Sequence, residues 1–507
     1  MANYSNSSSD HFLNADNFEA VLEQLGDALK AGLEFKARRE VTNLTGWPES
    51  GYSLLEPLPL EGTNISTLLD VIQRDILEGS INFSSNGYLG FPDACNSIAA
   101  IAGAIISDVA PQNLVNSRRW APLATFVEAA TVNWLRELIG YKVVESPQSS
   151  IDIGGFATTG GVLSNALAVL IARANLIPGF ALSGTRGNKI LRIIIPNHID
   201  HYSIRTSVNW LGMGTDSIVR APVVGYRYDL NELKRMVSAF VKGDEAVIVV
   251  AYAGDSRSLS IDNLDAIADI CEQYGAWLHI DACHGFQLAF SESLSVKLSG
   301  LARAHSTTAD AHKVLWVPHS LSYLLVRDPN FLKPVVGASD LVTTESMSLG
   351  ALTPFIGTKR FDSLKLWALI KHLGASNIGS YIELRHQLAC EFFELLRDNP
   401  RFIVISDEVD INGVIFMHLG NVNISDVTLD NDLIEYLNVH NLQIHDQLME
   451  RGKYYLHTFS IPDITNRFGD VARMLQPLRF MSGNVNHSRS DLIGLIAEIS
   501  HIAEIMA

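Results

Sequence analysis

The apolar positions along the chain gather into short, mostly apolar runs separated by segments with helical periodicity. Runs of this kind occupy residues 189–196, 246–254, 276–282 and 321–328. Mostly apolar runs of this length, without a regular polar alternation, are typical of strands that are buried on both faces of a sheet. Amphipathic helical patterns, such as residues 261–275, lie between them. Strand and helix therefore alternate, which predicts a mostly parallel sheet covered by helices on both sides.

The pattern changes at both ends of this alternating region. Residues 1–15 are polar and serine-rich, which is typical of a disordered segment, and residues 17–39 have helical periodicity. Residues 360–374 begin a long helical region that leads into a smaller α/β pattern. We therefore expect an N-terminal helical and extended segment, a large α/β domain and a small C-terminal α/β domain, with bounds at 1–94, 95–379 and 380–507.

Composition and charge narrow the class of protein. The chain has 507 residues, of which 47% are hydrophobic, and its formal net charge of −17 argues against a nucleic-acid or anionic-membrane partner. The apolar run 98–106 is too short to span a bilayer, and the N-terminus lacks the basic and apolar regions of a signal peptide. The four cysteines have neither metal-ligand nor disulfide spacing, so we expect a cytoplasmic protein without a metal site.

Two candidate binding segments lie in the first half of the alternating region, one before a predicted helix and one after a predicted strand. Gly160 and Gly161 precede a helical pattern, so they offer bare backbone N–H groups at a helix N-terminus to a phosphate. An ordinary tight turn is the alternative interpretation. His201 follows the first predicted strand, where it is placed to stack on a flat ring or to donate a proton, with His198 as the competing candidate.

Two further clusters follow the later strands. Asp281 ends an apolar strand, where a carboxylate either caps the next helix or holds a proton on a heteroaromatic nitrogen. Lys313 lies between His312 and the apolar run 314–318. Burial lowers the pKa of a lysine and makes it nucleophilic toward a carbonyl, whereas a surface lysine would lay its stem over the core edge. Together the four clusters supply the contacts that pyridoxal 5′-phosphate needs.

The motifs also resemble those of a known family, the pyridoxal-phosphate-dependent group II amino acid decarboxylases, which include aromatic-amino-acid, glutamate and diaminobutyrate decarboxylases. The similar segments are "TTGGVLSNALAVLIAR" (158–173) for the phosphate, "DHYS" (200–203) for ring stacking, "HIDACHGF" (279–286) for the aspartate and "ADAHKV" (309–314) for the lysine. The resemblance covers residues from about 85 to 375. The segments "APLATFVE" (121–128) and "KRFDSLKLW" (359–367) also look like those of the family.

The resemblance implies a fold-type I subunit that acts as a homodimer, with its N-terminal segment packed on the partner. It implies a Schiff base between the cofactor and Lys313, a ring contact from His201 and a pyridine-nitrogen contact from Asp281. We expect His312 beside the cofactor and substrate, and His284 as a further catalytic candidate. The remaining candidates are Thr159, Gly160, Gly161, Val162 and Cys283 for the cofactor and Phe91, Pro92 and Asp93 for the substrate.

The implied reaction is decarboxylation of an L-amino acid to the amine and carbon dioxide, but the chain departs from the family in several places, of which two bear most on the cofactor and the product. Val162 stands where a hydroxyl side chain is usual. Many relatives carry a proton-donating tyrosine in a mobile loop, whereas this chain has none between Tyr323 and Tyr381. His284 is the candidate substitute, because a histidine can titrate near neutral pH.

These departures leave alternatives open. Without an acid to protonate the carbanion, oxygen can compete, and the product becomes an aldehyde. A carbon–carbon lyase is a second alternative, and a relative that binds the cofactor without turnover is a third. The sequence does not specify the side chain of the substrate.

Overall fold

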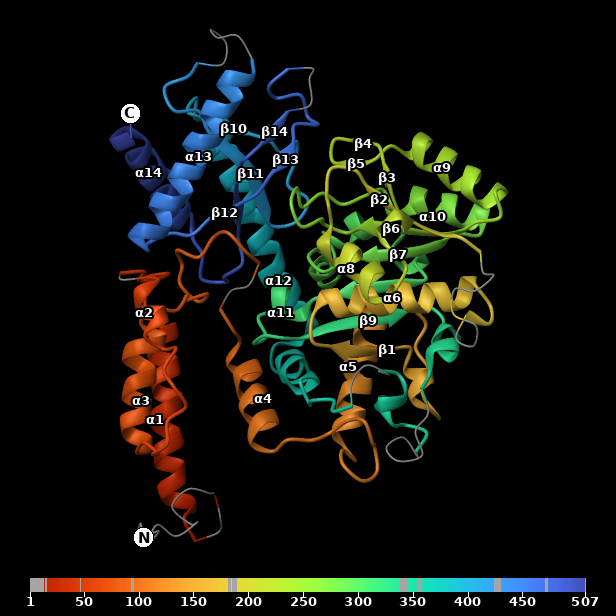
Figure 1. Ribbon diagram of the computed structural model, residues 1–507, viewed down its shortest axis with the longest axis horizontal. Helices are drawn as coiled ribbons and strands as arrows, with labels where there is room; N and C mark the ends of the chain where they lie inside the picture. Colours follow the sequence, from red (N-terminus) through yellow and green to blue (C-terminus); the bar gives the residue numbers. More distant parts are fainter. Residues whose placement is uncertain are drawn as a thin grey trace.

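Two sheets organise the chain, in a computed structural model that describes residues 13, 16–45, 47–92, 95–180, 184, 189–337, 345–353, 357–423, 430–469 and 473–506 (Figure 1). The large sheet has seven strands in the order β1-β9-β8-β7-β6-β2-β3. Its strands are β1 (Gly155–Thr158), β9 (Ser322–Val326), β8 (Ser306–Ala309), β7 (Trp277–Asp281), β6 (Ala246–Tyr252), β2 (Leu191–Pro196) and β3 (Ile218–Ala221). Only β9 runs antiparallel to its neighbours, which confirms the predicted mostly parallel sheet.

The burial of the central strands shows that the large sheet is covered on both faces. Every residue of β6 and of β7 is buried. Because consecutive residues of a strand point to opposite faces, neither face of the sheet meets water here. The helices of this domain are α4 (Ile98–Val109), α5 (Ala124–Leu138), α6 (Gly161–Leu176), α8 (Tyr202–Trp210), α9 (Leu230–Lys242), α10 (Leu264–Tyr274) and the short α11 (Ala311–Val314).

The small domain is built around a four-stranded antiparallel sheet in the order β10-β11-β15-β12. Its strands are β10 (Phe402–Val404), β11 (Gly413–His418), β15 (Leu478–Met481) and β12 (His457–Thr458), and its helices are α13 (Asn431–Arg451) and α14 (Arg489–Met506). Two short hairpin pairs complete the described strands: β4 (Val223–Val224) with β5 (Arg227–Tyr228), and β13 (Ile461–Pro462) with β14 (Met474–Leu475).

The long helix α12 (Ser363–Arg397) joins the two cores. Leu366 packs in the core around the large sheet, whereas Phe392 packs in the core of the small domain. The helix breaks at Gly374, whose φ of 72° is a backbone conformation that favours glycine. Residue 380, the boundary expected from the sequence, lies within α12, so the three-part division of the chain stays a prediction.

The helices of the described N-terminal segment project away from both domains (Figure 1). Helices α1 (Phe18–Lys36) and α3 (Ile65–Val71) lie side by side, with the short α2 (Glu49–Tyr52) near one end of the pair (Figure 1). None of the residues in these three helices is buried within this chain. Across the described residues, no helix is both long enough and apolar enough to cross a membrane.

The two additional family-like segments meet inside the large domain. Glu128 of α5 and Lys359, which precedes α12, form a buried ion pair at 3.1 Å. Lys359 Nζ also donates to the backbone oxygen of Ala157 at 2.6 Å, and the Ala157 N–H donates to Glu128 Oε1 at 3.0 Å. The pair therefore holds β1 in place immediately before the glycine turn at 160–161.

Candidate active site

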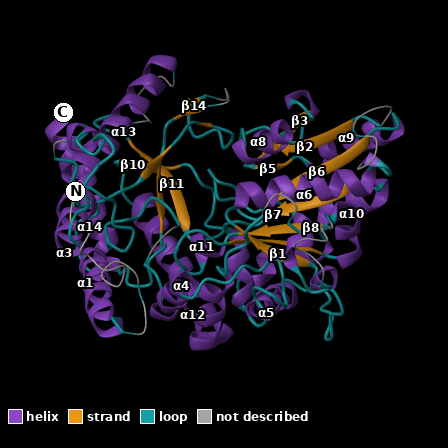
Figure 2. Cartoon of the chain, turned by 60° about the horizontal axis from the view of Figure 1, so that its bottom comes forward, coloured by secondary structure: helices purple, strands orange, loops and turns teal. Residues whose placement is uncertain are grey.

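A cavity of about 370 Å³ lies at the carboxyl ends of the parallel strands, which is where α/β sheets bind ligands. Two views place α11 between the large sheet and β11 of the small domain, next to this edge (Figures 1 and 2). The expected catalytic and cofactor-binding residues all line the cavity: Thr159, Gly160, Gly161, Val162, His201, Asp281, Cys283, His284, His312 and Lys313. The fold thus brings together residues from four separate segments of the sequence.

Asp281 is held as a buried carboxylate at the end of β7. Its Oδ1 accepts the Cys283 N–H at 3.1 Å, and its Oδ2 accepts Asn165 Nδ2 at 2.8 Å and lies 3.8 Å from His201 Nε2. Burial alone would raise the pKa of this carboxyl. The adjacent His201, these donors and the charge of Lys313 nevertheless hold the pKa of Asp281 well below its usual range. Asp281 is therefore an anion that lines the cavity, as a partner of a protonated ring nitrogen must be.

Asn165, which sequence reasoning missed, fixes the orientation of Asp281. Its amide nitrogen donates to Asp281 and to Ser203 Oγ, each at 2.8 Å. Its amide oxygen accepts from Thr308 Oγ1 at 2.8 Å and lies 3.0 Å from His279 Nε2. Burial lowers the pKa of His279 to about 4, so the neutral ring donates this bond. The only sequence signal was the position of Asn165, one helical turn after Gly161 on α6.

Lys313 lies in the cavity on α11, where Asp310 is its ion-pair partner. Lys313 Nζ lies 2.7 Å from Asp310 Oδ2, and Asp310 is fully buried. Burial by itself lowers the pKa of a lysine, but Asp310, with Cys283 and Asp281 nearby, raises the pKa of Lys313 above its usual value. The expectation of a lowered pKa is therefore wrong for the protein without a bound cofactor. Sequence reasoning overlooked Asp310, which follows β8 directly.

The structure distinguishes between the two histidines after β2. His201 is the N-cap residue of α8 and lines the cavity, and its Nδ1 has no hydrogen-bond partner among the described residues. Burial lowers the pKa of His201, against the opposing charge of Asp281. His198 is also buried but does not line the cavity, and its Nε2 lies 3.5 Å from Asp255 Oδ2. The ring available to a ligand is therefore that of His201.

His284 is buried in the wall of the cavity. Burial, the charge of Lys313 and the charge of Arg479 lower the pKa of His284 to about 3. The expectation that His284 titrates near neutral pH is therefore wrong, because the sequence did not reveal the two cations that face it. At neutral pH this imidazole is uncharged, and its role in catalysis stays a prediction.

The other expected residues lie in different surroundings. His312 lines the cavity, with its Nδ1 3.0 Å from the backbone oxygen of Leu321. Phe91 and Pro92 are not among the residues that line it, and the Phe91 ring lies 5.0 Å from the guanidinium of Arg479. Asp93 and residues 338–344 of the expected mobile loop lie outside the described residues.

The residues present fit a flat ring with a phosphate arm. A Cβ added at Gly161 would lie 2.8 Å from Cys283 Sγ and 2.9 Å from the Asp310 carboxylate, so only glycine leaves this approach to the helix N-terminus open. The ionised Asp281 suits a pyridinium nitrogen, and the Lys313 amine suits an aldehyde carbon. His201 presents a buried ring with a nitrogen that no described residue satisfies. The donor set therefore fits pyridoxal 5′-phosphate.

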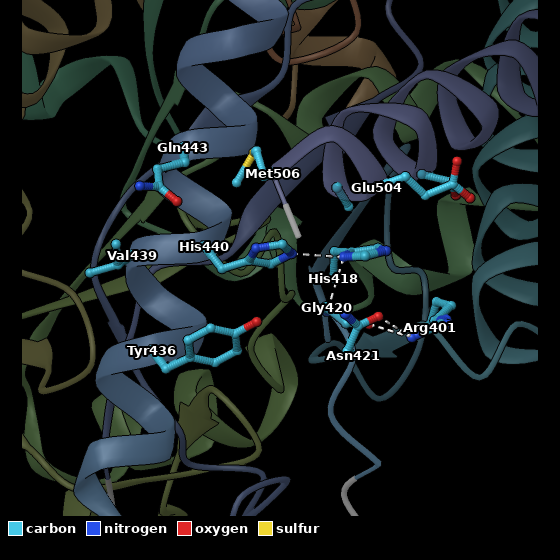
Figure 3. Close-up of a pocket in the computed structure, with 12 residues that line it drawn as sticks. Arg401, His418, Gly420, Asn421, Tyr436, Val439, His440, Gln443, Glu504 and Met506 are labelled. Atoms are coloured by element: carbon cyan, nitrogen blue, oxygen red, sulfur yellow. Dashed lines mark hydrogen bonds between the residues drawn. The ribbon is translucent and has the colours of Figure 1, made fainter.

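A second cavity, of about 400 Å³, lies in the small domain between α13, α14 and the segment after β11 (Figure 3). None of the candidate residues lines it. His418 and His440 point toward each other there, with His418 Nδ1 2.9 Å from His440 Nε2 and 3.1 Å from the Gly420 nitrogen. Arg401 is held by the Gly420 oxygen at 2.7 Å. His418, His440 and Arg401 in this second cavity therefore have hydrogen-bond partners within the protein.

Comparisons with known proteins identify the family and the fold. A family model described as "Pyridoxal-dependent decarboxylase conserved domain" matches residues 54–418. L-aspartate decarboxylase dtxS4 of Metarhizium robertsii is 28% identical over 354 residues, which are 68% of each chain. L-2,4-diaminobutyrate decarboxylase of Rhizobium meliloti is 29% identical over 335 residues, which are 65% of this chain and 64% of the relative. A crystal structure of mouse CSAD in apo form has a TM-score of 0.85 at 22% identity, covers 96% of this chain and 99% of its own, and establishes the shared fold.

Proposed function

Because the chain belongs to the pyridoxal-dependent decarboxylase family and is a pyridoxal 5′-phosphate-dependent amino acid decarboxylase, we propose that Lys313 carries the cofactor and that the product is an amine. The main support for this assignment is that Lys313, Asp281 and His201 all line one cavity, at the ends of the strands. Each of these side chains comes from a different segment. No other arrangement in the described part of the chain combines a lysine, an ionised carboxylate and a flat ring in this way.

When bound, the cofactor accepts the electrons that are left when carbon dioxide departs from the substrate. Asp281 keeps a proton on the heteroaromatic nitrogen, because its carboxylate is ionised and rigidly held by Asn165 and Cys283. The backbone N–H groups at the start of α6 bind the phosphate. His201, which lines the cavity, would lie against the face of the bound ring.

A second product is favoured by one specific observation, the low pKa of His284. An imidazole with a pKa of about 3 is uncharged at neutral pH and is a poor acid. If no group supplies a proton after carbon dioxide departs, oxygen would act as the oxidant, and the products would be an aldehyde, ammonia and hydrogen peroxide. His284 can donate the proton only if the bound cofactor raises its pKa. In that case we expect His284→Ala to lower the yield of amine more than it lowers the consumption of substrate. An equal amine-to-aldehyde ratio for both proteins in air would show that His284 is not the proton donor.

The identity of the substrate is tested by a panel of amino acids with mass spectrometry of the products. The panel contains L-aspartate and L-2,4-diaminobutyrate, since two relatives are named for these substrates and their side chains have opposite charges. We expect an amine and carbon dioxide from at least one member of the panel. A protein that binds the cofactor fully but converts none of the twenty standard amino acids or diaminobutyrate would contradict the proposed function.

We also propose that the chain acts as a homodimer, because α1 carries an apolar stripe that the described residues leave about half exposed. The stripe consists of Phe18, Leu22, Leu25, Leu29 and Leu33, whose exposed fractions are 44–53%. A continuous apolar helix face of this length is typical of a helix that packs against a partner. A second copy of the chain offers the same stripe to it.

Sedimentation analysis tests the dimer. We expect one species with twice the mass of the chain, and a shift toward monomer in Leu25→Glu. The control is Gln24→Glu, which adds the same charge to α1 at an exposed position outside the stripe. If Leu25→Glu sediments like the wild-type protein, α1 does not form the interface.

We further propose that the protein resides in the cytoplasm. All four cysteines are free, and Cys271 and Cys283 are buried. Free thiols are typical of a reducing compartment. Fractionation of cells that express the tagged protein checks this proposal, and enrichment of the protein in a membrane or secreted fraction would contradict it.

A further inference from the structure

Tyr252 is a buried side chain in the candidate active site to which the proposed function assigns no role. It is the last residue of β6, its exposed fraction is 2%, and it lines the cavity. Its hydroxyl has no hydrogen-bond partner among the described residues. A buried hydroxyl without a hydrogen-bond partner lowers the free energy of unfolding by about 1–3 kcal/mol, so an unpaired hydroxyl in this position calls for an explanation.

Other buried tyrosines of the chain do not share this feature. The hydroxyl of Tyr228 donates to the backbone oxygen of Val250 at 2.8 Å, and that of Tyr141 donates to the Ala304 oxygen at 2.9 Å. The hydroxyl of Tyr226 donates to the Pro462 oxygen at 2.9 Å. Tyr252 differs from these residues in lining the cavity, which suggests that its missing acceptor belongs to the ligand.

The position of Tyr252 is fixed by its neighbours. The backbone N–H of Tyr252 donates to Asp262 Oδ2 at 2.8 Å, and the backbone N–H of Asp262 donates to the backbone carbonyl oxygen of Tyr252 at 2.9 Å. The ring meets the ring of His201 edge-on, with centroids 5.2 Å apart. Burial, together with the charges of Asp281, Asp262 and Asp255, raises the pKa of Tyr252 well above its usual value, so the phenol stays protonated and remains a donor.

The sheet order indicates which part of the ligand Tyr252 faces. Tyr252 and Asp281 are register partners on neighbouring strands, so their side chains leave the same face of the sheet. The phosphate cradle at Gly161 lies against Cys283 and Asp310, which belong to the segments after β7 and β8. Along the strand order β8-β7-β6, Asp281 therefore stands between the phosphate cradle and Tyr252.

The cofactor has a matching arrangement of groups. In pyridoxal 5′-phosphate the phosphate arm and the 3-oxygen flank the aldehyde carbon on opposite sides, and the ring nitrogen lies across the ring from that carbon. The proposed function gives the phosphate, the nitrogen and the aldehyde carbon their partners. We propose, resting on that function, that the hydroxyl of Tyr252 donates a hydrogen bond to the 3-oxygen of the bound cofactor.

The variant Tyr252→Phe tests this proposal because it removes one oxygen and leaves the ring against His201. In the protein without cofactor we expect a higher melting temperature, since a buried unsatisfied hydroxyl is lost. In the presence of pyridoxal 5′-phosphate we expect about tenfold weaker binding and a shifted absorption band with a changed pH midpoint, because the 3-oxygen belongs to the chromophore.

The matched control is Tyr228→Phe, which removes a buried hydroxyl that is already satisfied outside the cavity. This control should lower the melting temperature and leave cofactor affinity and absorption unchanged. An unchanged affinity and spectrum in Tyr252→Phe would overturn the proposal. A change confined to the KM for the amino acid would overturn it too, because the acceptor would then belong to the substrate.

A second ligand identifies the acceptor atom directly. The 3-deoxy analogue of pyridoxal 5′-phosphate lacks the 3-oxygen but retains the aldehyde and the phosphate. We expect Tyr252→Phe to weaken binding of the natural cofactor about tenfold and to leave binding of the analogue unchanged. Equal losses for both ligands would overturn the proposal. If the wild-type protein binds neither ligand, the proposed function itself fails, and the wild-type titration therefore separates the two failures.

Discussion

The two cavities of this molecule have similar volumes, about 370 Å³ at the large sheet and about 400 Å³ in the small domain, yet their polar groups differ in kind. In the small domain, His418 pairs with His440, so each of these rings has a partner within the protein (Figure 3). At the large sheet, the hydroxyl of Tyr252 and one nitrogen of His201 have no partner among the described residues. The two cavities therefore differ in their unpaired polar groups and not in their volume, and polar groups without a partner favour the large-sheet cavity as the ligand site.

The electrostatics of the two cavities differ in the same way. The large-sheet cavity contains the ionised Asp281 and the ion pair of Lys313 with Asp310, all of which are costly to bury unless they serve a ligand. The histidines of the small-domain cavity are neutral, since burial lowers the pKa of His418 to about 4 and also lowers the pKa of His440. Perturbed charges that converge on one cavity are typical of active sites, which favours the large-sheet cavity as the candidate.

The largest effect is expected from Asp281→Ala. Removing the carboxylate leaves the heteroaromatic nitrogen without its counter-ion, so we expect amine production to fall by several orders of magnitude while the fold is kept. Amine production with a saturating substrate measures this effect. The control is Asp463→Ala, which removes another buried carboxylate, one bonded to the backbone N–H groups of Arg467 and Phe468 in the small domain. Equal losses of activity in the two variants would show that Asp281 in the large-sheet cavity matters no more for the reaction than a buried carboxylate of the small domain.

A pH dependence of stability is expected from both regions. Folding lowers the pKa of His284 to about 3 and the pKa of His418 to about 4, whereas the pKa of an unfolded histidine is about 6.5. Between about pH 6.5 and pH 4 the unfolded chain therefore binds more protons, and the free energy of unfolding falls as the pH falls. Asp281 has a lowered pKa and adds stability above about pH 3.9, which is lost only at more acidic pH.

Thermal unfolding of the protein without cofactor, measured from pH 7.5 to 4.5, checks this expectation. His284→Gln and His418→Gln should each make the decline in melting temperature shallower. A melting temperature that does not change across this range would show that the buried histidines are not held neutral.

The smallest effect is expected from His440→Leu. This change removes one hydrogen bond to His418, which still accepts the Gly420 N–H, so the free energy of unfolding should fall by about 1 kcal/mol. Chemical unfolding measures the loss, and amine production should stay within about twofold of the wild-type rate. A tenfold loss of amine production would mean that the small-domain cavity takes part in the reaction.

The sequence predicted the fold where apolar runs are long. The four predicted strands correspond to β2, β6, β7 and β9, because buried strands of this kind are rich in apolar residues. Strands β1, β3 and β8 were missed, since "GFAT", "IVRA" and "STTA" are only four residues long and contain glycine, arginine or hydroxyl residues. These strands are recognised only from their pairing with neighbours that are distant in sequence.

The sequence also predicted many of the residues that line the large-sheet cavity, but not their protonation. Gly161, His201, Asp281 and Lys313 were found because each follows or precedes an apolar element in a family-like motif. The expected lowered pKa of Lys313 and the expected near-neutral pKa of His284 were wrong, since both depend on charges that only the folded chain brings together. Motifs identify the groups that take part in chemistry, whereas the packing around them sets their protonation.

The most direct test of the central claim is to locate the cofactor. The protein loaded with pyridoxal 5′-phosphate is reduced with borohydride, digested and mapped by mass spectrometry. We predict a single modified residue, Lys313, and loss of both the modification and the visible absorption band in Lys313→Ala. Attachment to Lys359, Lys365 or any other lysine, or an unchanged band in Lys313→Ala, would contradict the assignment of the large-sheet cavity as the active site.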